Sequence, residues 1–181
     1  MYYSVDPGNP DPDHRVLLTS GTSLAHFAAW RADPVGLRIA LERGAGMGPD
    51  DLGRMPLHYL AAPTGSPPDD NVADCLQLLL AASVNPQRAD GNHQACYLVA
   101  ARAGNAALVE SLAEAGVRLN ATDRDGNTGL HLAAGSDNAE HVRLVLAFLG
   151  AGVDPRAKNN VGRTARELAI LAGSQGVAVL L

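Results

Sequence analysis

The chain has 181 residues and a net charge of -5, and 46% of its residues are hydrophobic but only 4% aromatic. This length is enough for one domain with a substantial core and leaves little room for two. The acidic balance, with no basic block, argues against binding to nucleic acid or anionic membranes, and no apolar run approaches the ~18 residues that span a bilayer. Abundant alanine and few aromatics favour a soluble, intracellular domain of closely packed helices.

The chain opens with MYYSVDPGNPDPDHR, which has three prolines and neither a basic nor an apolar segment. It therefore does not have the form of a secretory signal, and we expect residues 1–15 to be a flexible segment. Two cysteines, Cys75 and Cys96, are too few for a disulfide framework. We expect them to be free thiols in a reducing cytoplasm.

Beyond this segment, four stretches of sequence are similar to one another, and a fifth is a looser copy. They are SLAHFAAW from Ser23, PLHYLAA from Pro56, ACYLVAARAGN from Ala95, TGLHLAAGS from Thr128 and GRTARELAI from Gly162. Most are followed by an apolar stretch of helical character and then by a turn of small residues. We therefore predict a repeat of two helices in each unit.

The spacing between these units is regular. Four residues each stand 18 positions after the turn residues Gly44, Ser83, Gly116 and Gly152; they are Ala62, Ala101, Ala134 and Ile170. Together with Ala29, we expect them to occupy equivalent, buried positions. Seven positions after the same turn residues stand Asp51, Asp90, Asp123 and Asn159. Extra residues fall at 63–71 and 136–140, which are rich in loop-forming residues and are expected in helix–helix turns.

This pattern resembles the ankyrin repeat, roughly D-x-x-G-x-T-P-L-H-x-A-A-x-x-G-x-x-x-V-V-x-L-L-L-x-x-G-A-D, over nearly the whole chain from Ser20. It is best kept in DRDGNTGLHLAA from Asp123. Unit three departs from it, with ACYL in place of T-P-L-H, and unit two holds its Pro-Leu-His one place out of register, which predicts a kink or bulge there. The resemblance implies an all-α ankyrin-repeat solenoid with short β-hairpin fingers over residues 16–181, in units of about 16–50, 51–89, 90–122, 123–158 and 159–181.

Few residues suggest chemistry. His26, His58 and His131 recur once per unit, too far apart to share one metal ion, and the resemblance implies that such histidines hydrogen-bond between neighbouring loops. The aspartates are expected to tie down their own fingers. The GAGMG stretch from Gly44 lacks a following Lys-Ser/Thr and is read as a turn, and a left-handed helix stop suits its first glycine. No nucleophile–base arrangement is found, so we expect no enzyme activity, no metal and no cofactor.

The resemblance places a protein partner in a concave groove, against finger tips and the exposed ends of the first helices. The matching positions are Trp30, Arg31, Leu52, Met55, Asn92, Gln94, Arg102, Arg124, Asn127, Val161 and Arg163. Tryptophan is the residue type most enriched in interface hot spots, and the arginines form a basic face on an acidic protein. Two alternatives stay open: the arginines only solvate the surface, and Trp30 packs under the N-terminal segment.

Two functions follow. The first is a cytoplasmic adaptor or inhibitor that binds one protein with acidic residues at the contact, and that binds no nucleic acid, membrane or small-molecule substrate. The second is the repeat module of a larger enzyme or effector, which the apolar end at Leu181 favours. The alanine- and arginine-rich composition looks bacterial. Bacterial proteins of this kind include toxin-neutralising partners and host-directed effectors, and an effector could be secreted without a signal peptide.

Overall fold

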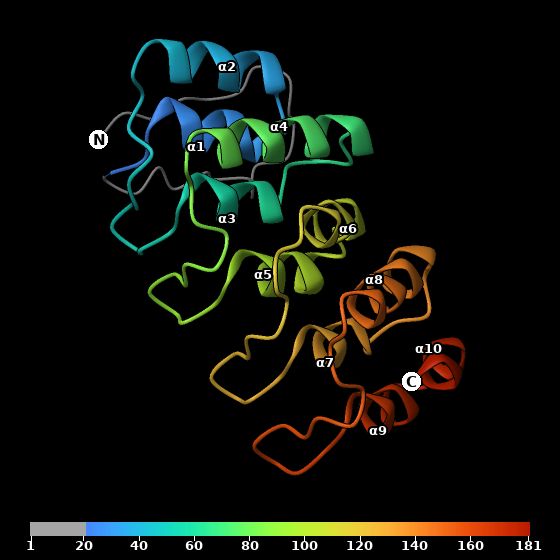
Figure 1. The fold of residues 1–181 in the computed structure, drawn as a ribbon. Coiled ribbons are helices and arrows are strands. Elements are labelled where there is room, and N and C mark those ends of the chain that lie inside the picture. Colours follow the sequence, from blue (N-terminus) through green and yellow to red (C-terminus); the bar gives the residue numbers. More distant parts are fainter. Residues whose placement is uncertain (1–20) are drawn as a thin grey trace, which may run out of the picture.

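A computed structural model of the protein describes residues 21–181, and the predicted flexible segment 1–15 lies outside them. Within the described residues, ten helices follow one another in five pairs, and each helix packs on its counterpart in the next pair (Figure 1). The first-helix row consists of α1 (Leu24–Trp30), α3 (Pro56–Ala61), α5 (Cys96–Ala103), α7 (Gly129–Ala133) and α9 (Ala165–Ala172). The second-helix row consists of α2 (Pro34–Glu42), α4 (Asp69–Ala81), α6 (Ala106–Glu114), α8 (Ala139–Gly150) and α10 (Gln175–Leu180).

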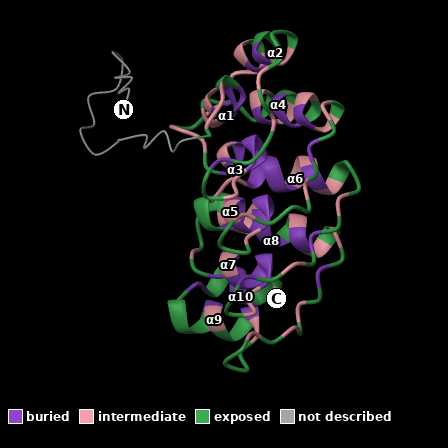
Figure 2. Ribbon diagram, turned by 90° about the vertical axis from the view of Figure 1, so that its left-hand side faces the viewer, coloured by how far each residue is buried: buried purple, intermediate pink, exposed green. Residues whose placement is uncertain are grey.

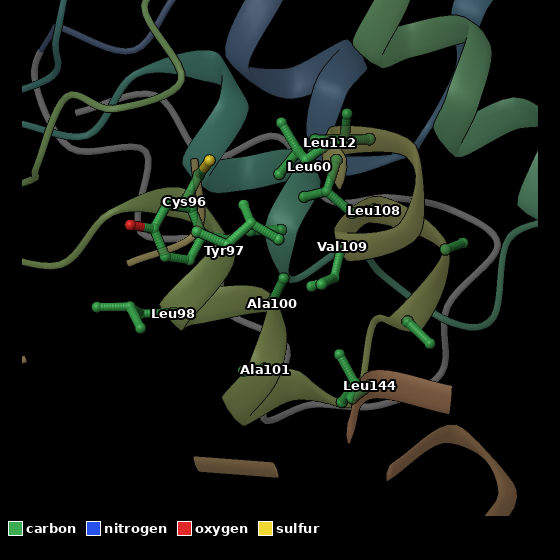
Figure 3. Packing of buried hydrophobic residues seen from close by; sticks show 14 of the residues in the cluster. Leu60, Cys96, Tyr97, Leu98, Ala100, Ala101, Leu108, Val109, Leu112 and Leu144 are labelled. Carbon is green, nitrogen blue, oxygen red and sulfur yellow. The ribbon is translucent and has the colours of Figure 1, made fainter. Parts of the chain in front are cut away.

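Small and large residues divide the core between the two rows. The first helices bury alanines such as Ala29, Ala101 and Ala133, each 0% exposed, which let neighbouring helices approach closely. The second helices bury larger side chains, and in Figure 3 Leu108 and Leu112 of α6 lie in one cluster with residues of α3 and α5. Each such leucine contributes about 1.5–3 kcal/mol of burial free energy. Figure 2 shows buried residues recurring along the stack, so each unit depends on its neighbours for its core.

The turn that ends each second helix forms as predicted. Gly44, Gly116 and Gly152 have φ of +73°, +73° and +78°, the left-handed conformation that glycine adopts without a steric penalty. Ser83 takes the same place in unit two with φ +62°. The helical solenoid is therefore confirmed.

The fingers differ from the predicted β-hairpins, because residues 21–181 contain no strand and only one isolated bridge, between Ala89 and Ala95. We number the fingers by unit. Finger 2 is residues 50–54, finger 3 is 90–94, finger 4 is 123–127 and finger 5 is 159–163. Each is a five-residue turn in which the first N–H donates to the last carbonyl, at 2.9–3.0 Å. A turn this short leaves no length for a strand ladder.

The predicted register was wrong in unit two. Ala62 is exposed there and Ala61 is buried, because the link that follows Gly44 is one residue shorter than in the other units and finger 2 begins at Asp50. In unit five the register holds, but Ile170 is 47% exposed, since no further helix pair packs on α9 within the described residues. The predicted kink in unit two is thus a one-residue deletion before its finger.

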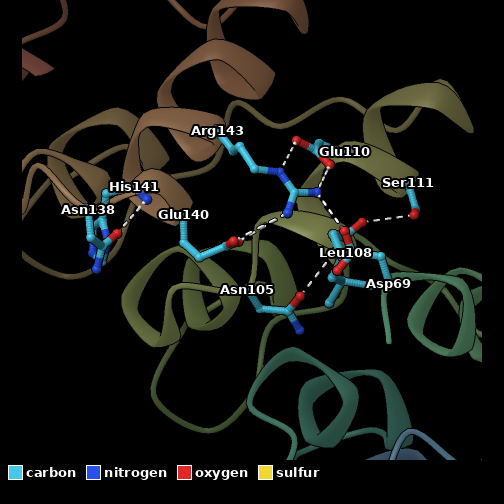
Figure 4. A network of polar contacts seen from close by, with 10 residues as sticks. Asp69, Asn105, Leu108, Glu110, Ser111, Asn138, Glu140, His141 and Arg143 are labelled. Carbon is cyan, nitrogen blue, oxygen red and sulfur yellow. Dashed lines mark hydrogen bonds and ion pairs between the residues drawn. The ribbon is translucent and has the colours of Figure 1, made fainter. Parts of the chain in front are cut away.

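The larger insertion lies between α3 and α4, as expected for a helix–helix turn. Part of it forms the loop 62–68, and part lengthens α4, which has 13 residues where α6 has nine. The longer α4 brings Asp69 within 2.9 Å of Arg143 on α8. Figure 4 shows that Arg143 also bonds Glu110 of α6 and Glu140 of its own helix. One arginine therefore joins three consecutive second helices.

Candidate protein-binding face

Each finger is closed by one side chain at its base. The Oδ1 atom of Asp50 accepts N–H bonds from Leu52 and Arg54 at 2.9 and 2.8 Å. The same two bonds, to the second and fourth residue after the base, form at Asp90, Asp123 and Asn159. The predicted role of Asp90 and Asp123 is confirmed. The prediction for Asp51 was wrong by one place, because finger 2 begins at Asp50, which is 5% exposed.

Three histidines join units one, two and four to the next finger. Nδ1 of His26, His58 and His131 accepts the backbone N–H of the residue that caps its helix, at 3.1–3.2 Å. The proton therefore sits on Nε2, which donates to a carbonyl of the following finger: to Arg54 at 3.2 Å, to Gln94 at 3.1 Å and to Arg163 at 3.0 Å. The predicted bond between neighbouring loops is confirmed. Burial lowers the pKa of His26 and His58, since it disfavours the charged ring.

Two pairs of fingers are also joined directly through their backbones. Gly91 N–H of finger 3 donates to Leu52 O of finger 2 at 2.8 Å, and Asn160 N–H of finger 5 donates to Asp125 O of finger 4 at 2.9 Å. The fourth residue of the earlier finger is a glycine with positive φ in both pairs. A Cβ at Gly53 would lie 2.8 Å from Gly91 N, and one at Gly126 would lie 2.9 Å from Asn160 N. These contacts require glycine for steric reasons as well as for φ.

The junction between fingers 3 and 4 is built differently. Its fourth residue is His93, with φ +62°, and no backbone hydrogen bond joins these two fingers in the described part of the chain. Arg102 Nη2 instead pairs with Asp123 Oδ2 at 2.8 Å, and Arg124 Nη2 donates to Gly91 O at 3.1 Å.

Unit three also lacks the linking histidine. Leu98 stands in its place, and the hydroxyl of the fully buried Tyr97 accepts Ala121 N–H at 2.8 Å. Side chains therefore make, at this junction, the connections that backbone and histidine make elsewhere.

We call the fingers together with the first-helix row the finger face. Most residues predicted to meet a partner are exposed: on the finger face Leu52, Asn92, Arg102, Arg124, Val161 and Arg163, and directly after α1 Arg31. Trp30, Gln94 and Asn127 are half-buried.

Met55 does not belong to this set, because it caps α3 and is only 8% exposed. The residue equivalent to Gln94, Asn127 and Arg163 is Arg54, which sequence reasoning missed through the same one-place shift. Counting back from the Pro-Leu-His of unit two would have found it.

Several of these side chains are already held by the fold. Arg54 pairs with Asp50 at 2.8 Å and donates to the hydroxyl of Tyr59 at 2.7 Å. Asn127 donates to Asp123 Oδ2 at 3.2 Å and accepts from Asn159 Nδ2 at 2.9 Å. These contacts fix polar groups in place along the finger face, which lowers the entropy that a partner would have to remove.

Charge is distributed unevenly between the two sides of the solenoid. Among residues 21–181, the first helices, the fingers and the segments that link them carry ten Arg or Lys and seven Asp or Glu. The second helices and helix–helix turns carry three Arg and nine Asp or Glu. With its linking segments, which hold five of the ten basic residues, the finger-face side is thus net positive, while the second-helix side is strongly negative. The finger face itself carries five Arg and six Asp or Glu. Two of the seven carboxylates on the finger-face side, on Asp50 and Asp123, are buried and pair with Arg54 and Arg102.

Other chemistry has little support in residues 21–181. They contain no group of three His, Cys, Asp or Glu side chains placed to hold a metal ion, and none of their helices is long and apolar enough to cross a membrane. Cys75 and Cys96 are buried, and desolvation raises the pKa of both thiols to about 12. Neither thiol forms appreciable thiolate at neutral pH.

A row of helix pairs joined by short fingers, with histidine bonds between units, defines a repeat solenoid whose units share one structural plan. Residues 93–181 match the family model for ankyrin repeats in three copies. The chain is an ankyrin repeat protein, as its sequence pattern indicated. Ankyrin repeats are in general protein–protein interaction modules.

Similar curated proteins carry the same repeats. The chain is 32% identical over 160 residues to human SH3 and multiple ankyrin repeat domains protein 2, an alignment that covers 85% of this chain and 8% of the relative. It is 44% identical over 59 residues to the Caenorhabditis elegans ankyrin repeat and LEM domain-containing protein 1 homolog, covering 33% of this chain and 8% of that protein. It is 38% identical over 77 residues to the Drosophila melanogaster neurogenic locus Notch protein, covering 42% and 3%. The chain spans under a tenth of each relative's length.

Proposed function

We propose that the finger face binds an acidic segment of a partner protein, and that the protein acts as an adaptor or inhibitor by holding that segment. The observation that carries this proposal is the uneven charge distribution. The fingers, first helices and linking segments carry ten basic and seven acidic residues, and the other side carries three basic and nine acidic. An acidic segment is attracted to the first side and repelled by the second. The charge pattern therefore selects both the partner and the face it meets.

The contacts on this face suit carboxylates. Arginine offers up to five N–H donors in a planar fork that matches a carboxylate. Arg54 and Arg102 are oriented by Asp50 and Asp123, while Arg163 is exposed at the end of finger 5. Trp30 lies on α1 at the position that Arg102 occupies on α5, counted from the helix cap, and adds a large rigid surface of the kind found at hot spots.

A displayed library of random peptides tests this proposal without a known partner. We expect the parent protein to enrich peptides rich in Asp and Glu, with binding that weakens as salt rises. Arg163→Glu should reduce this enrichment. Arg38→Glu is the matched control, since Arg38 is exposed on α2, and it should bind like the parent. Enrichment of neutral or basic peptides, or equal effects of the two reversals, would contradict the proposal.

Reversal of Arg102 is a poor test of binding. Its guanidinium neutralises Asp123, whose side chain is 3% exposed, so a glutamate there would place two carboxylates together and disturb finger 4. Substitution of Arg102 by glutamine keeps a hydrogen-bond donor and is the better variant.

A second candidate, the repeat module of a longer protein, is favoured by the small share of each relative that the chain spans. In that case the finger face would position a partner for a separate activity. The intact mass of the natural protein decides between the two, because a mass well above the 18.7 kDa of this chain requires additional sequence.

A further inference from the structure

We propose that the junction between fingers 3 and 4 is where the finger face binds a carboxylate side chain of its partner. This inference rests on the proposed function and adds the position and chemistry of one specific contact. It follows from three features of the junction: backbone groups that are paired at the other finger junctions, the side chain of His93, and an excess of cationic donors.

The first feature is a backbone donor and acceptor with no hydrogen-bond partner among residues 21–181. Gly91 N–H and Asn160 N–H each donate to the carbonyl of the preceding finger. The equivalent donor in finger 4 is Arg124 N–H, and the equivalent acceptor in finger 3 is Asn92 O. Neither group has a hydrogen bond within residues 21–181, so Arg124 N–H is available to a ligand.

His93 explains why this pair does not form. At the same position in fingers 2 and 4, a Cβ would lie within 2.9 Å of the following finger's backbone nitrogen. Real Cβ atoms do not approach this closely, so a finger that follows His93 cannot pack as near. The φ of +62° at His93 is also unfavourable for a residue other than glycine. Among fingers 2–5, only finger 3 has a residue other than glycine at its fourth position, and this finger makes no backbone bond to the finger that follows it.

The third feature is the surplus of donors. Fingers 3 and 4 carry the carboxylates of Asp90, Asp123 and Asp125. The acceptor oxygens of Asp123, at the base of finger 4, are occupied: Oδ1 accepts from Asp125 N–H and Asn127 N–H, and Oδ2 accepts from Arg102 and Asn127. Arg102 and Arg124 each use one terminal nitrogen in these contacts, and Arg102 is 53% exposed. Their remaining N–H groups point to no protein acceptor in the described chain.

A ligand carboxylate satisfies this arrangement, because it can accept Arg124 N–H with one oxygen and a guanidinium N–H with the other. A neutral amide side chain has a single acceptor oxygen and also brings two donors of its own. The junction therefore distinguishes Glu or Asp from Gln or Asn on the partner, whereas a surface of solvated arginines would respond only to net charge.

The probe for this site is a short capped peptide of alternating glutamate and serine, with its glutamine counterpart as the control. Amide chemical shifts of the ¹⁵N-labelled protein are followed during titration at low salt. We expect the glutamate peptide to shift the amides of Arg124 and His93 saturably, and the glutamine peptide to leave them in place.

Two substitutions then separate a site from a structural feature. His93→Gly should let Arg124 N–H bond Asn92 O, slow hydrogen exchange at Arg124 and weaken peptide binding by about tenfold or more, the loss expected for a charge-assisted hydrogen bond. Arg124→Gln alters an exposed residue, so it should keep the fold and weaken binding by a similar factor. If His93→Gly does not slow hydrogen exchange at Arg124, the finger bond has not formed, and the peptide affinity of Arg124→Gln alone decides whether the junction binds the carboxylate.

The outcomes distinguish this inference from the proposed function. If the glutamate peptide binds the parent and both junction variants equally, but Arg163→Glu weakly, acidic segments bind elsewhere on the finger face and only the junction site is overturned. If the glutamate and glutamine peptides bind alike, or neither binds, the acidic-partner proposal fails with it. If the junction variants lose binding of the glutamate peptide while Arg38→Glu binds it like the parent, both the junction site and the acidic-partner proposal are supported.

Discussion

Units three and four are joined to their following neighbours in different ways. Finger 4 bonds finger 5 through Asn160 N–H, and His131 donates to the Arg163 carbonyl at 3.0 Å. Finger 3 has no backbone bond to finger 4 among the described residues, and unit three has Leu98 where unit four has His131. Ala101 and Ala134 are nonetheless equally buried, at 0% exposure.

This difference shows that helix stacking and finger bonding are separable in the solenoid. The alanine contacts set how the first helices stack, whereas finger residues decide which polar groups are left for a partner. A repeat can therefore change its binding chemistry without changing its core. The predictions that follow test how the junctions are held, and they are taken from the largest expected effect to the smallest.

Tyr97→Ala should have the largest effect, because Tyr97 is fully buried and its hydroxyl accepts Ala121 N–H. We expect a loss of about 3–5 kcal/mol in the free energy of unfolding, as for other large buried aromatics. Urea unfolding measures it. Tyr97→Phe isolates the hydroxyl and should cost about 1–3 kcal/mol, the penalty for a donor left without its partner. An unchanged stability for Tyr97→Phe would mean that the hydroxyl does not hold this junction.

His131→Leu places the residue of unit three into unit four. It should destabilise by about 1–3 kcal/mol, since Thr128 N–H and the Arg163 carbonyl lose a buried partner. The control is His141→Leu, because His141 is half-buried on α8 and bonds only its neighbouring cap Asn138. We expect a change of about 0.5 kcal/mol or less there. Equal losses in the two variants would show that the bond between units adds nothing.

Acid should weaken the histidine junctions. Burial lowers the pKa of His26 and His58 below the ordinary value of 6.5, so the unfolded chain binds more protons than the folded one as pH falls through that value. The free energy of unfolding should therefore be highest above about pH 7 and decrease toward pH 5. Urea unfolding across this range measures the slope, and His58→Leu should flatten it. A stability that rises with acid would contradict the assignment of neutral rings.

Much of the fold was predictable because the repeat carries its own alignment. The apolar segments and the turn residues Gly44, Ser83, Gly116 and Gly152 placed the helix pairs and left-handed turns correctly. The shift at Asp51 and Ala62 arose because four identical spacings suggested one constant linker, while the Pro-Leu-His of unit two already showed a one-residue deletion. The length of the fingers, which are turns and not hairpins, depends on hydrogen bonds that sequence spacing does not reveal.

The binding face was predicted by position, and the structure shows what position alone could not. Arg102 and Arg124 were selected as exposed cations, but their bonds to Asp123 and Gly91 connect residues 21 to 33 positions apart. The special role of His93 also escaped prediction. Its signal was nevertheless present, because the other three described fingers have glycine at that position.

The smallest expected effect is that of Arg143→Met, on the opposite side of the same junction. Arg143 bonds Glu110 of unit three and Asp69 of unit two, so it connects α4, α6 and α8 where the fingers of units three and four lack a backbone bond. Its side chain is 34% exposed, and Asp69 is 61% exposed. Solvent screening should limit the loss to about 0.2–1 kcal/mol, decreasing as salt is added.

Combining Arg143→Met with His93→Gly tests whether the two sides of this junction act independently. Arg143 lies on the second-helix row and His93 on a finger, with no shared partner in the described chain, so their effects on unfolding should add to within about 0.5 kcal/mol. Additivity would support the separation of stacking from finger bonding. A coupling above about 1 kcal/mol would mean that the Arg143 contacts compensate for the missing finger bond, and that the junction opens and closes as a unit.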